Sequence, residues 1–592
     1  MHALFFSPYA DVWVHGLPEA LIAEVLSDHD WEVSRITCDG ELSGHCVAMA
    51  AKGVGYHATK KERLEVCDTC KSRQKLLKRV ANSNDISLST FIKDADRMEV
   101  ANLLKSVTPE TWHLLQVDGI NVGKIAAYDF LLTYKINSLE IPAQYWSAYL
   151  TDLENSLKVF FAATSFLTKL NPDIVVTYNG MYATNNLVNQ LARQMGIRTW
   201  SLHAGHHLVD KFSTLYIYES SQLPVMAYKT DRWKSQRHVP IGPEDSQHVT
   251  EHLLQLFKGI NRFVYSAPSG QRSSLDIKKI LGVQPGSKVL LATMSSSDEV
   301  FAAQMAGVLE ETETESLFLD GVVWINYLVS ELENRPDLHL VIRVHPREFP
   351  NKRELVSSKQ AAILLELFQS LPNNVSVNWP DQELSLYDVA QITDVVLNAT
   401  STAGIELGAL GLPVVHHRVA HMLAYDPLMY PVVNSREDYF LFVDRALETG
   451  WSIENMRLAY RWWAFFFRHV AIDIGEGFSY PADGYISASN GKSANLRNSV
   501  LQIAVKYGPS VMEYRDMFRR RPMKNADLIA SGLAGVNSMV IAPQSELIYS
   551  VEQETSFLAA EMRRIDKHIN PAGFDRSNWA GHMSSFISEA QK

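Results

Sequence analysis

Short apolar segments alternate with helix-like segments along two long stretches of this 592-residue chain, and this alternation limits the folds it can adopt. In the second stretch the apolar segments are KVLLATM (288–294), LHLVIRVH (338–345), VSVNW (375–379), DVVLNA (394–399) and PVVHH (413–417). Most are separated by a helical pattern, so consecutive strands cannot pair as tight hairpins. The pattern predicts a parallel sheet covered by helices on both faces.

The first half of the chain has the same rhythm, in ALFFSPY (3–9), WEVSRITC (31–38), PDIVVTYNG (172–180) and IRTWSLHAG (197–205). The predicted fold class is therefore α/β with two facing Rossmann-like domains, at residues 1–270 and 275–450, and ligands bound in one cleft between them. The first domain also carries a cysteine-containing insert at about 38–75 and a mostly helical region at about 87–170. Residues 451–592 are predicted to form a helical extension and a tail.

Composition excludes several classes of protein. A net charge of -11 argues against nucleic acid as a main partner, because there is no basic excess to neutralise phosphates. No apolar run is long enough for a membrane span. The N-terminal segment lacks a basic region before its apolar residues, so we expect no signal peptide. Together these features predict a cytoplasmic protein. Contact with the inner face of a membrane is the alternative, through RWWAFFFRHV (461–470), although its apolar residues fill nearly every side, as in a core helix.

Polar side chains follow three strands of the second domain and should meet at one edge of its sheet. The segment LNATSTAGIE leads from a strand into a helix, whose N-terminal N–H groups and dipole attract phosphate. Hydroxyls, a guanidinium and an imidazole around a helix N-terminus suit a diphosphate, and the helix carboxylate is placed to bind a ribose diol. No G-x-G-x-x-G follows the first strand, which argues against a dinucleotide. The candidate residues are Ser296, Arg343, His345, Ser401, Thr402 and Glu406.

The series VIRVHPRE, LPNNVSV and DQELSLYDVAQITDVVLNATSTAGIELGALGLPVV resembles the donor domain of bacterial GT-B glycosyltransferases of the capsular-polysaccharide and O-antigen type. It is also similar to Kdo transferases and CDP-glycerol polymerases. In the first domain, VVTYNGMYATNNLVNQLARQMGIRTWSLHAG resembles the acceptor side of these enzymes, with Asn179 and Gly180 after one strand. Relatives often carry an acid in the turn after the next strand, where this chain has HAGHH at 203–207.

The resemblance implies transfer of a sugar from a nucleotide-sugar to a glycan or lipid-linked acceptor in surface polysaccharide synthesis, without a catalytic metal. His203 and Asp210 are the candidate bases. Two other classes stay open. A non-hydrolysing sugar-nucleotide epimerase would share the fold and the diphosphate site, and a non-catalytic scaffold would bind glycan without nucleotide.

The only cysteines are Cys38, Cys46, Cys67 and Cys70, in CDGELSGHC and CDTC. Two pairs in one short segment predict a metal site of four thiolates, since cytosolic proteins rarely keep structural disulfides. Zinc is the default, and an iron–sulfur cluster is the alternative. Buried reduced cysteines and a redox pair at Cys67 and Cys70 are the other interpretations.

Overall fold

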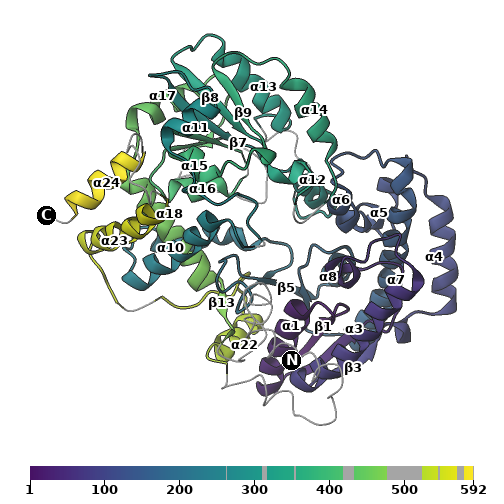
Figure 1. The fold of residues 1–592 in the computed structure, drawn as a ribbon. Coiled ribbons are helices and arrows are strands. Elements are labelled where there is room, and N and C mark those ends of the chain that lie inside the picture. The colour runs from purple at the N-terminus through teal and green to yellow at the C-terminus, as the bar shows by residue number, and fades with distance from the viewer. Residues whose placement is uncertain are drawn as a thin grey trace.

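The computed structural model describes residues 1–261, 263–309, 317–351, 355–399, 401–417, 432–475, 523–544, 547–569 and 579–590. Within them the chain forms two sheets, each flanked by helices (Figure 1). We call the sheet that contains β1, with its helices, the first lobe and the sheet that contains β7 the second lobe. The predicted class of two Rossmann-like domains is confirmed by the strand orders given below.

The first sheet has the order β13-β6-β5-β4-β1-β2-β3. Its strands from β3 to β5 are parallel, while β6 and β13 are antiparallel to their neighbours. Their order 5-4-1-2-3 is that of a Rossmann half, with its reversal between β1 and β4. The bounds are β1 His2–Phe6, β2 Glu32–Thr37, β3 Asn84–Ser87, β4 Ile174–Tyr178, β5 Arg198–Ala204, β6 Thr214–Glu219 and β13 Ile472–Asp473.

The second sheet has the order β12-β11-β10-β7-β8-β9 and is parallel throughout its described strands. This is the Rossmann order, with its reversal between β7 and β10. Its central strands are buried on both faces, as their continuous apolar runs require. The bounds are β7 Lys288–Thr293, β8 Leu338–Arg343, β9 Val375–Asn378, β10 Val395–Asn398, β11 Val414–His417 and β12 Val432–Val433.

Helices cover both sheets, and α4 to α7 lie between residues 87 and 170. The helices that begin before residue 270 are α1 Trp13–Asp28, α2 Val47–Ala51, α3 Lys60–Ala81, α4 Asp94–Ser106, α5 Val122–Ala126, α6 Tyr128–Tyr134, α7 Trp146–Leu170, α8 Ala183–Gln194, α9 Asp231–Gln236 and α10 Pro243–Lys258. Those of the second lobe are α11 Ser274–Ile280, α12 Ser297–Met305, α13 Gly321–Leu332, α14 Lys359–Leu367, α15 Leu386–Ala390, α16 Ala403–Gly408 and α17 Tyr439–Thr449.

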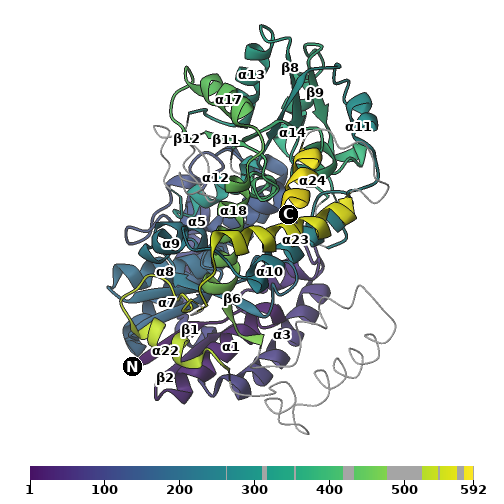
Figure 2. The ribbon, with the colours of Figure 1, turned by 90° about the vertical axis from the view of Figure 1, so that its left-hand side faces the viewer.

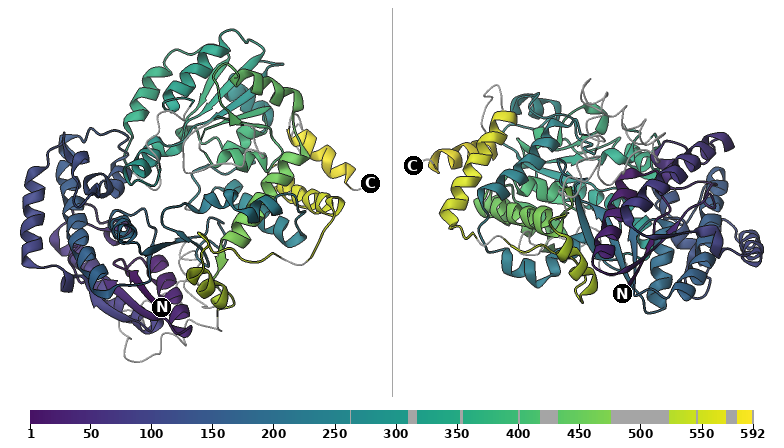
Figure 3. Two further views of the ribbon diagram at one scale, coloured as in Figure 1. Left: turned by 180° about the vertical axis from the view of Figure 1, so that it is seen from behind. Right: turned by 90° about the horizontal axis from the view of Figure 1, so that it is seen from below.

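The chain returns from the second lobe to the first through α18 (Ile453–Phe465). Residues Phe466–Val470 continue it as a π-helical turn, and β13 then pairs with β6, which adds a segment beyond residue 450 to the first sheet. Further along are α22 (Ala526–Ala534), α23 (Val551–Ile569) and α24 (Trp579–Glu589). Figure 2 shows α23 beside α10 and α18, and Figure 3 shows α23 and α24 (yellow) on the side of the molecule away from the N-terminal helices.

A buried ion pair fastens α23 to α18. Arg461 donates through Nε to Glu554 Oε1 at 2.8 Å and through Nη2 to Oε2 at 2.5 Å, and Glu554 is fully buried. A two-pronged contact of this kind fixes orientation as well as distance. The C-terminal helices are therefore held to the segment that joins the two lobes.

The aromatic run at 461–470 packs into the core. Trp462, Trp463 and Phe466 are each no more than 6% exposed, so the core-helix interpretation is confirmed for these side chains. No helix in the described ranges is both long and apolar enough to cross a membrane.

Polar contacts join the lobes around α6 and α12. Arg347, after β8, donates to Leu132 O of α6 at 2.9 Å, and Asn137 donates to Ser297 Oγ at 2.9 Å. The carboxyl ends of both sheets therefore lie near the junction between the lobes.

Candidate functional site

A row of polar side chains crosses the second sheet at the carboxyl ends of its strands. The register aligns Asn378 of β9 with Arg343 of β8, and Arg343 with Thr293 of β7. Thr293 aligns in turn with Asn398 of β10, and its hydroxyl donates to Asn398 Oδ1 at 2.6 Å. Because the chain order reverses between β7 and β10, ligands of such a sheet bind just beyond this row.

Arg343 is a buried cation in that row. It is 7% exposed, and its Nη1 donates to Leu384 O at 2.8 Å and to the side-chain oxygen of Asn378. Both acceptors are neutral, and within the described part of the chain no carboxylate forms an ion pair with it. Burial lowers the pKa of Arg343 to about 10, which still leaves it charged at neutral pH. A buried charge without a counter-charge is costly, and a bound anion would supply one.

The turn after β10 brings the start of α16 close to this row. Asn398 Nδ2 donates to Ser401 O at 3.1 Å, and Ser401 Oγ accepts from Ala403 N at 3.3 Å. A Cβ at position 404 would lie 2.6 Å from Asn398 Nδ2, so Gly404 permits the close approach of the helix. Thr402 is the N-cap of α16, but its side chain makes no cap hydrogen bond.

Glu406 lies one turn into α16 and is 8% exposed. Burial raises its pKa, while hydrogen bonds with the hydroxyls of Thr402 and Tyr387 oppose that shift. The Tyr387 hydroxyl donates to Oε2 at 2.8 Å. A carboxylate has about four acceptor positions, so Glu406 keeps capacity for a further donor.

Ser296 and His345 also lie after strand ends of this sheet, but they have different partners. The Ser296 hydroxyl donates to Asp298, so that donor is already used within the protein. His345 Nδ1 accepts from Arg347 N at 3.3 Å, which leaves the hydrogen of a neutral ring on Nε2. Burial lowers the pKa of His345 to about 4, and the charge of Arg347 adds to the shift. The neutral ring can donate to an anion through Nε2.

A cavity of about 840 Å³ lies at the carboxyl ends of the first sheet. Its walls include Tyr9 after β1, Asn179 after β4, His203 of β5, and Asp129 and Leu132 of α6. It therefore opens at the reversal between β1 and β4, and α6 brings its wall to the junction with the second lobe. Its volume is in the range of small-molecule sites.

Asp129 and His203 are two of the several titratable groups in this cavity that have shifted pKa values. Burial raises the pKa of Asp129 to about 7, although its Oδ2 accepts a hydrogen bond from Ala183 N at 3.0 Å. Burial lowers the pKa of His203 to about 4, and the charge of Lys211 adds to the shift. His203 Nδ1 lies 2.8 Å from Ala204 O, so Nε2 is the unprotonated nitrogen. Asp129 ionises closer to neutral pH than His203 does.

Asn179 and Gly180, the predicted acceptor-side pair, occupy positions that few residue types can take. Asn179 lies at φ 54, a left-handed conformation that asparagine tolerates, and its Oδ1 accepts from Met181 N at 3.3 Å. A Cβ at Gly180 would lie 2.2 Å from Ser201 Oγ, so only glycine fits there. Of the two, Asn179 contributes to the cavity wall.

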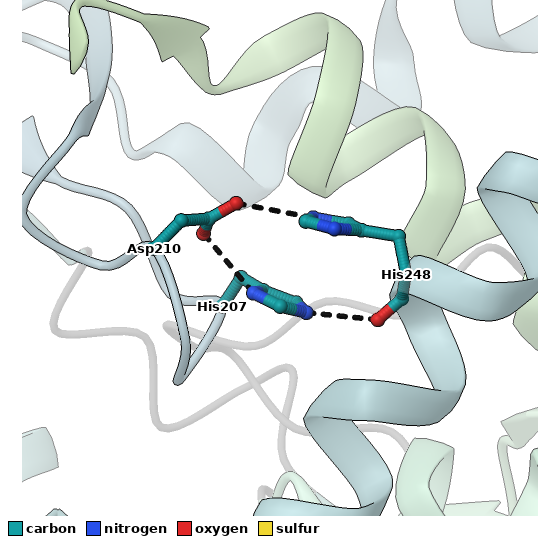
Figure 4. Close-up of side chains that lie close together, drawn as sticks. All are labelled: His207, Asp210 and His248. Carbon is teal, nitrogen blue, oxygen red and sulfur yellow. Dashed lines mark hydrogen bonds and ion pairs between the residues drawn. The ribbon is translucent and has the colours of Figure 1, made fainter.

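Asp210 does not line the cavity that contains His203. It bridges the edges of two stacked imidazole rings, with Oδ1 3.0 Å from His207 Nδ1 and Oδ2 3.3 Å from His248 Nε2 (Figure 4). His207 Nε2 is also 2.8 Å from His248 O. Asp210 and His248 border a second cavity, of about 570 Å³, instead. The two bases predicted from the sequence are thus placed in different cavities.

His207, Asp210 and His248 are the one group among the described residues with three nitrogen and carboxylate oxygen atoms close enough for a metal ion. The two rings are stacked, with centroids 3.8 Å apart and planes at 11°. Lone pairs in the planes of parallel rings run side by side, so they cannot converge on one ion unless a ring turns. The contacts instead hold the turn after β5 against α10.

No protein-family model and no curated protein matches this sequence. Among solved structures, KpsC from Thermosulfurimonas dismutans, a beta Kdo 2,4 transferase, is 14% identical over 49% of this chain and 79% of that one, with a TM-score of 0.29. The calicheamicin glycosyltransferase CalG4 is 12% identical over 86% and 98%, with a TM-score of 0.25. The UDP-GlcNAc 2-epimerase from Neisseria meningitidis is 14% identical over 78% and 94%, with a TM-score of 0.23. Scores this low carry no argument about function.

We predict that Arg343→Met reduces the stabilisation of the protein by nucleoside diphosphates in thermal unfolding. Losing a charge-assisted hydrogen bond of about 1.5–3 kcal/mol should weaken binding roughly 10- to 100-fold. Arg335→Met is the matched control, because Arg335 precedes the same strand and pairs with Asp444 at 2.6 Å. A folded Arg343→Met protein with the affinity of the Arg335→Met protein would contradict the anion site.

Proposed function

We propose that this protein is a glycosyltransferase that moves a sugar from a nucleotide-sugar to a hydroxyl of a glycan or lipid-linked acceptor. The observation that carries the proposal is the pairing of two sites at the junction of the lobes. One offers an uncompensated buried cation, Arg343, beside a helix N-terminus, and the other is a large cavity with a carboxyl group, Asp129, that ionises near neutral pH.

On the donor side, Arg343 and His345 Nε2 would hold the diphosphate, with Ser401 and Thr402 at the start of α16. Glu406 would accept hydrogen bonds from the ribose. As the bond between the anomeric carbon and the phosphate oxygen breaks, negative charge grows on the departing nucleotide. Preorganised hydrogen-bond donors lower the barrier, because they stabilise the charge on the departing nucleotide more than the charge on the intact nucleotide-sugar. The Ser296 hydroxyl would have to leave Asp298 to take part.

On the acceptor side, the attacking hydroxyl would lie in the cavity of the first lobe and lose its proton to Asp129. The new bond forms between this hydroxyl oxygen and the anomeric carbon, and the nucleoside diphosphate leaves with the bonding electrons. A base whose pKa is close to the working pH is the most effective, which favours Asp129 over His203. His203 Nε2 then accepts a hydrogen bond from the substrate that receives the sugar.

An epimerase acting on the nucleotide-sugar alone is the second candidate. It would need acidic or basic groups around the sugar ring of one substrate, whereas a transferase also needs room for a second substrate, and the cavity of about 840 Å³ in the opposite lobe offers that room. The cavity therefore favours transfer. The resemblance in sequence favours surface polysaccharide as the class of acceptor, with the transfer taking place in the cytoplasm. The roles proposed for Arg343, His345 and Asp129 do not require a catalytic metal.

A product analysis tests the proposal. We expect the protein, incubated with UDP-, GDP-, TDP- and CMP-sugars and a panel of simple glycans, to release free nucleotide from one donor while the sugar enters a new glycoside, as followed by NMR. An epimerase would leave the nucleotide attached and change the configuration of the sugar ring. A scaffold would change neither, and either of these outcomes would overturn the proposal.

We predict that turnover rises with pH through about 7, because Asp129 must be deprotonated to accept the proton. The Asp129→Asn protein should have little activity, and its turnover should no longer rise with pH. It should stay folded, because the amide oxygen can still accept a hydrogen bond from Ala183 N. His203→Gln should keep the rise, and neither change should alter donor affinity. If His203→Gln removes the rise and Asp129→Asn does not, the base has been assigned to the wrong residue.

A further inference from the structure

The four cysteines come together around one small cavity, although they belong to three places in the chain. Cys38 follows β2, Cys46 is the N-cap of α2, and Cys67 and Cys70 lie three residues apart on α3. Cys70 is 7% exposed, and the other three are partly buried. The segment at 38–75 is therefore the connection between β2 and β3, and its folding gathers all the thiols of the chain.

Backbone N–H groups surround the sulfur atoms. Gly40 N donates to Cys38 Sγ at 3.4 Å, while the Cys70 thiol donates to Pro8 O at 3.7 Å. The backbone of Asp11 also hydrogen-bonds to Cys70, and that of Met49 to Cys46. Such N–H groups around sulfur are a feature by which proteins tune metal–thiolate centres.

All four cysteines are free thiols, and no disulfide joins any two of them.

The spacing of the sulfur atoms favours one of the two kinds of metal centre. In a zinc site with Zn–S of about 2.3 Å, tetrahedral geometry puts the four sulfurs roughly 3.8 Å apart. No three of these four sulfurs lie within 4.8 Å of one another. A cluster of several irons spreads its cysteines more widely, because its thiolates bind different irons. The enclosed space is about 20 Å³, so the side chains must turn to admit a cluster.

We propose that Cys38, Cys46, Cys67 and Cys70 hold an iron–sulfur cluster that braces the first lobe. Tyr9, Leu42 and Cys46 border both this cavity and the large one beside it. The cluster would thereby fix the loop at 38–46, including His45, whose ring lies 3.7 Å from that of Tyr56 and whose Nδ1 lies 3.7 Å from Asp152. Its role is structural, with no electron transfer required.

The test is the metal and sulfide content of the full chain purified without oxygen. We expect two or four irons per chain, an equal amount of acid-labile sulfide, and visible absorption that disappears when a chelator removes the iron. Cys70→Ala should lose most of the iron and lower the unfolding temperature. Thr69→Ala, an exposed neighbour on the same turn of α3, should keep the iron content of the unchanged protein.

Two results would overturn the cluster. One is a single zinc per chain with no sulfide, and the other is less than about a tenth of an equivalent of either metal. If Cys70→Ala fails to fold, Cys67→Ser gives the same test, since Cys67 is partly exposed and its loss leaves a smaller gap.

Discussion

The parallel register of the second sheet is the constraint on which the candidate site depends. Parallel strands end at one edge, so Asn378, Arg343, Thr293 and Asn398 form a row although they come from distant parts of the sequence. The row lies where the strand order reverses, and helices cannot cover the sheet there. Arg343 is kept in it as a buried charge whose partners among the described residues are neutral, at a cost to stability that an anionic ligand would remove.

The first sheet repeats this arrangement with a different chemistry. Its reversal opens into a cavity in which burial moves the pKa of Asp129 up and that of His203 down. One edge thus offers a buried positive charge, and the other offers a carboxyl group that ionises near neutral pH. Contacts such as that of Arg347 with Leu132 join the two lobes near these edges.

The sequence predicted the fold well because both sheets consist of apolar runs separated by helices. It missed β3, which is short and polar, and β6, which pairs antiparallel outside the alternating pattern. Arg343 and Glu406 could be chosen because Arg343 ends one apolar strand and Glu406 lies in the helix that follows another. Asp129 could not, because it sits in an ordinary helical pattern and its pKa depends on packing against residues far along the chain. Asp210 was predicted together with His203 because the two residues are close in sequence. The fold places them at different cavities, which the sequence does not reveal.

The central claim is that the second sheet binds a nucleotide through its phosphates. Calorimetric titration of the unchanged protein with a nucleoside, its monophosphate and its diphosphate tests this most directly, since only the number of phosphates differs. We expect the diphosphate of one base to bind at least about tenfold more tightly than the nucleoside, a difference of about 1.4 kcal/mol, and to bind less tightly as salt is added. Equal affinity for nucleoside and diphosphate, or no binding of any diphosphate, would contradict the account.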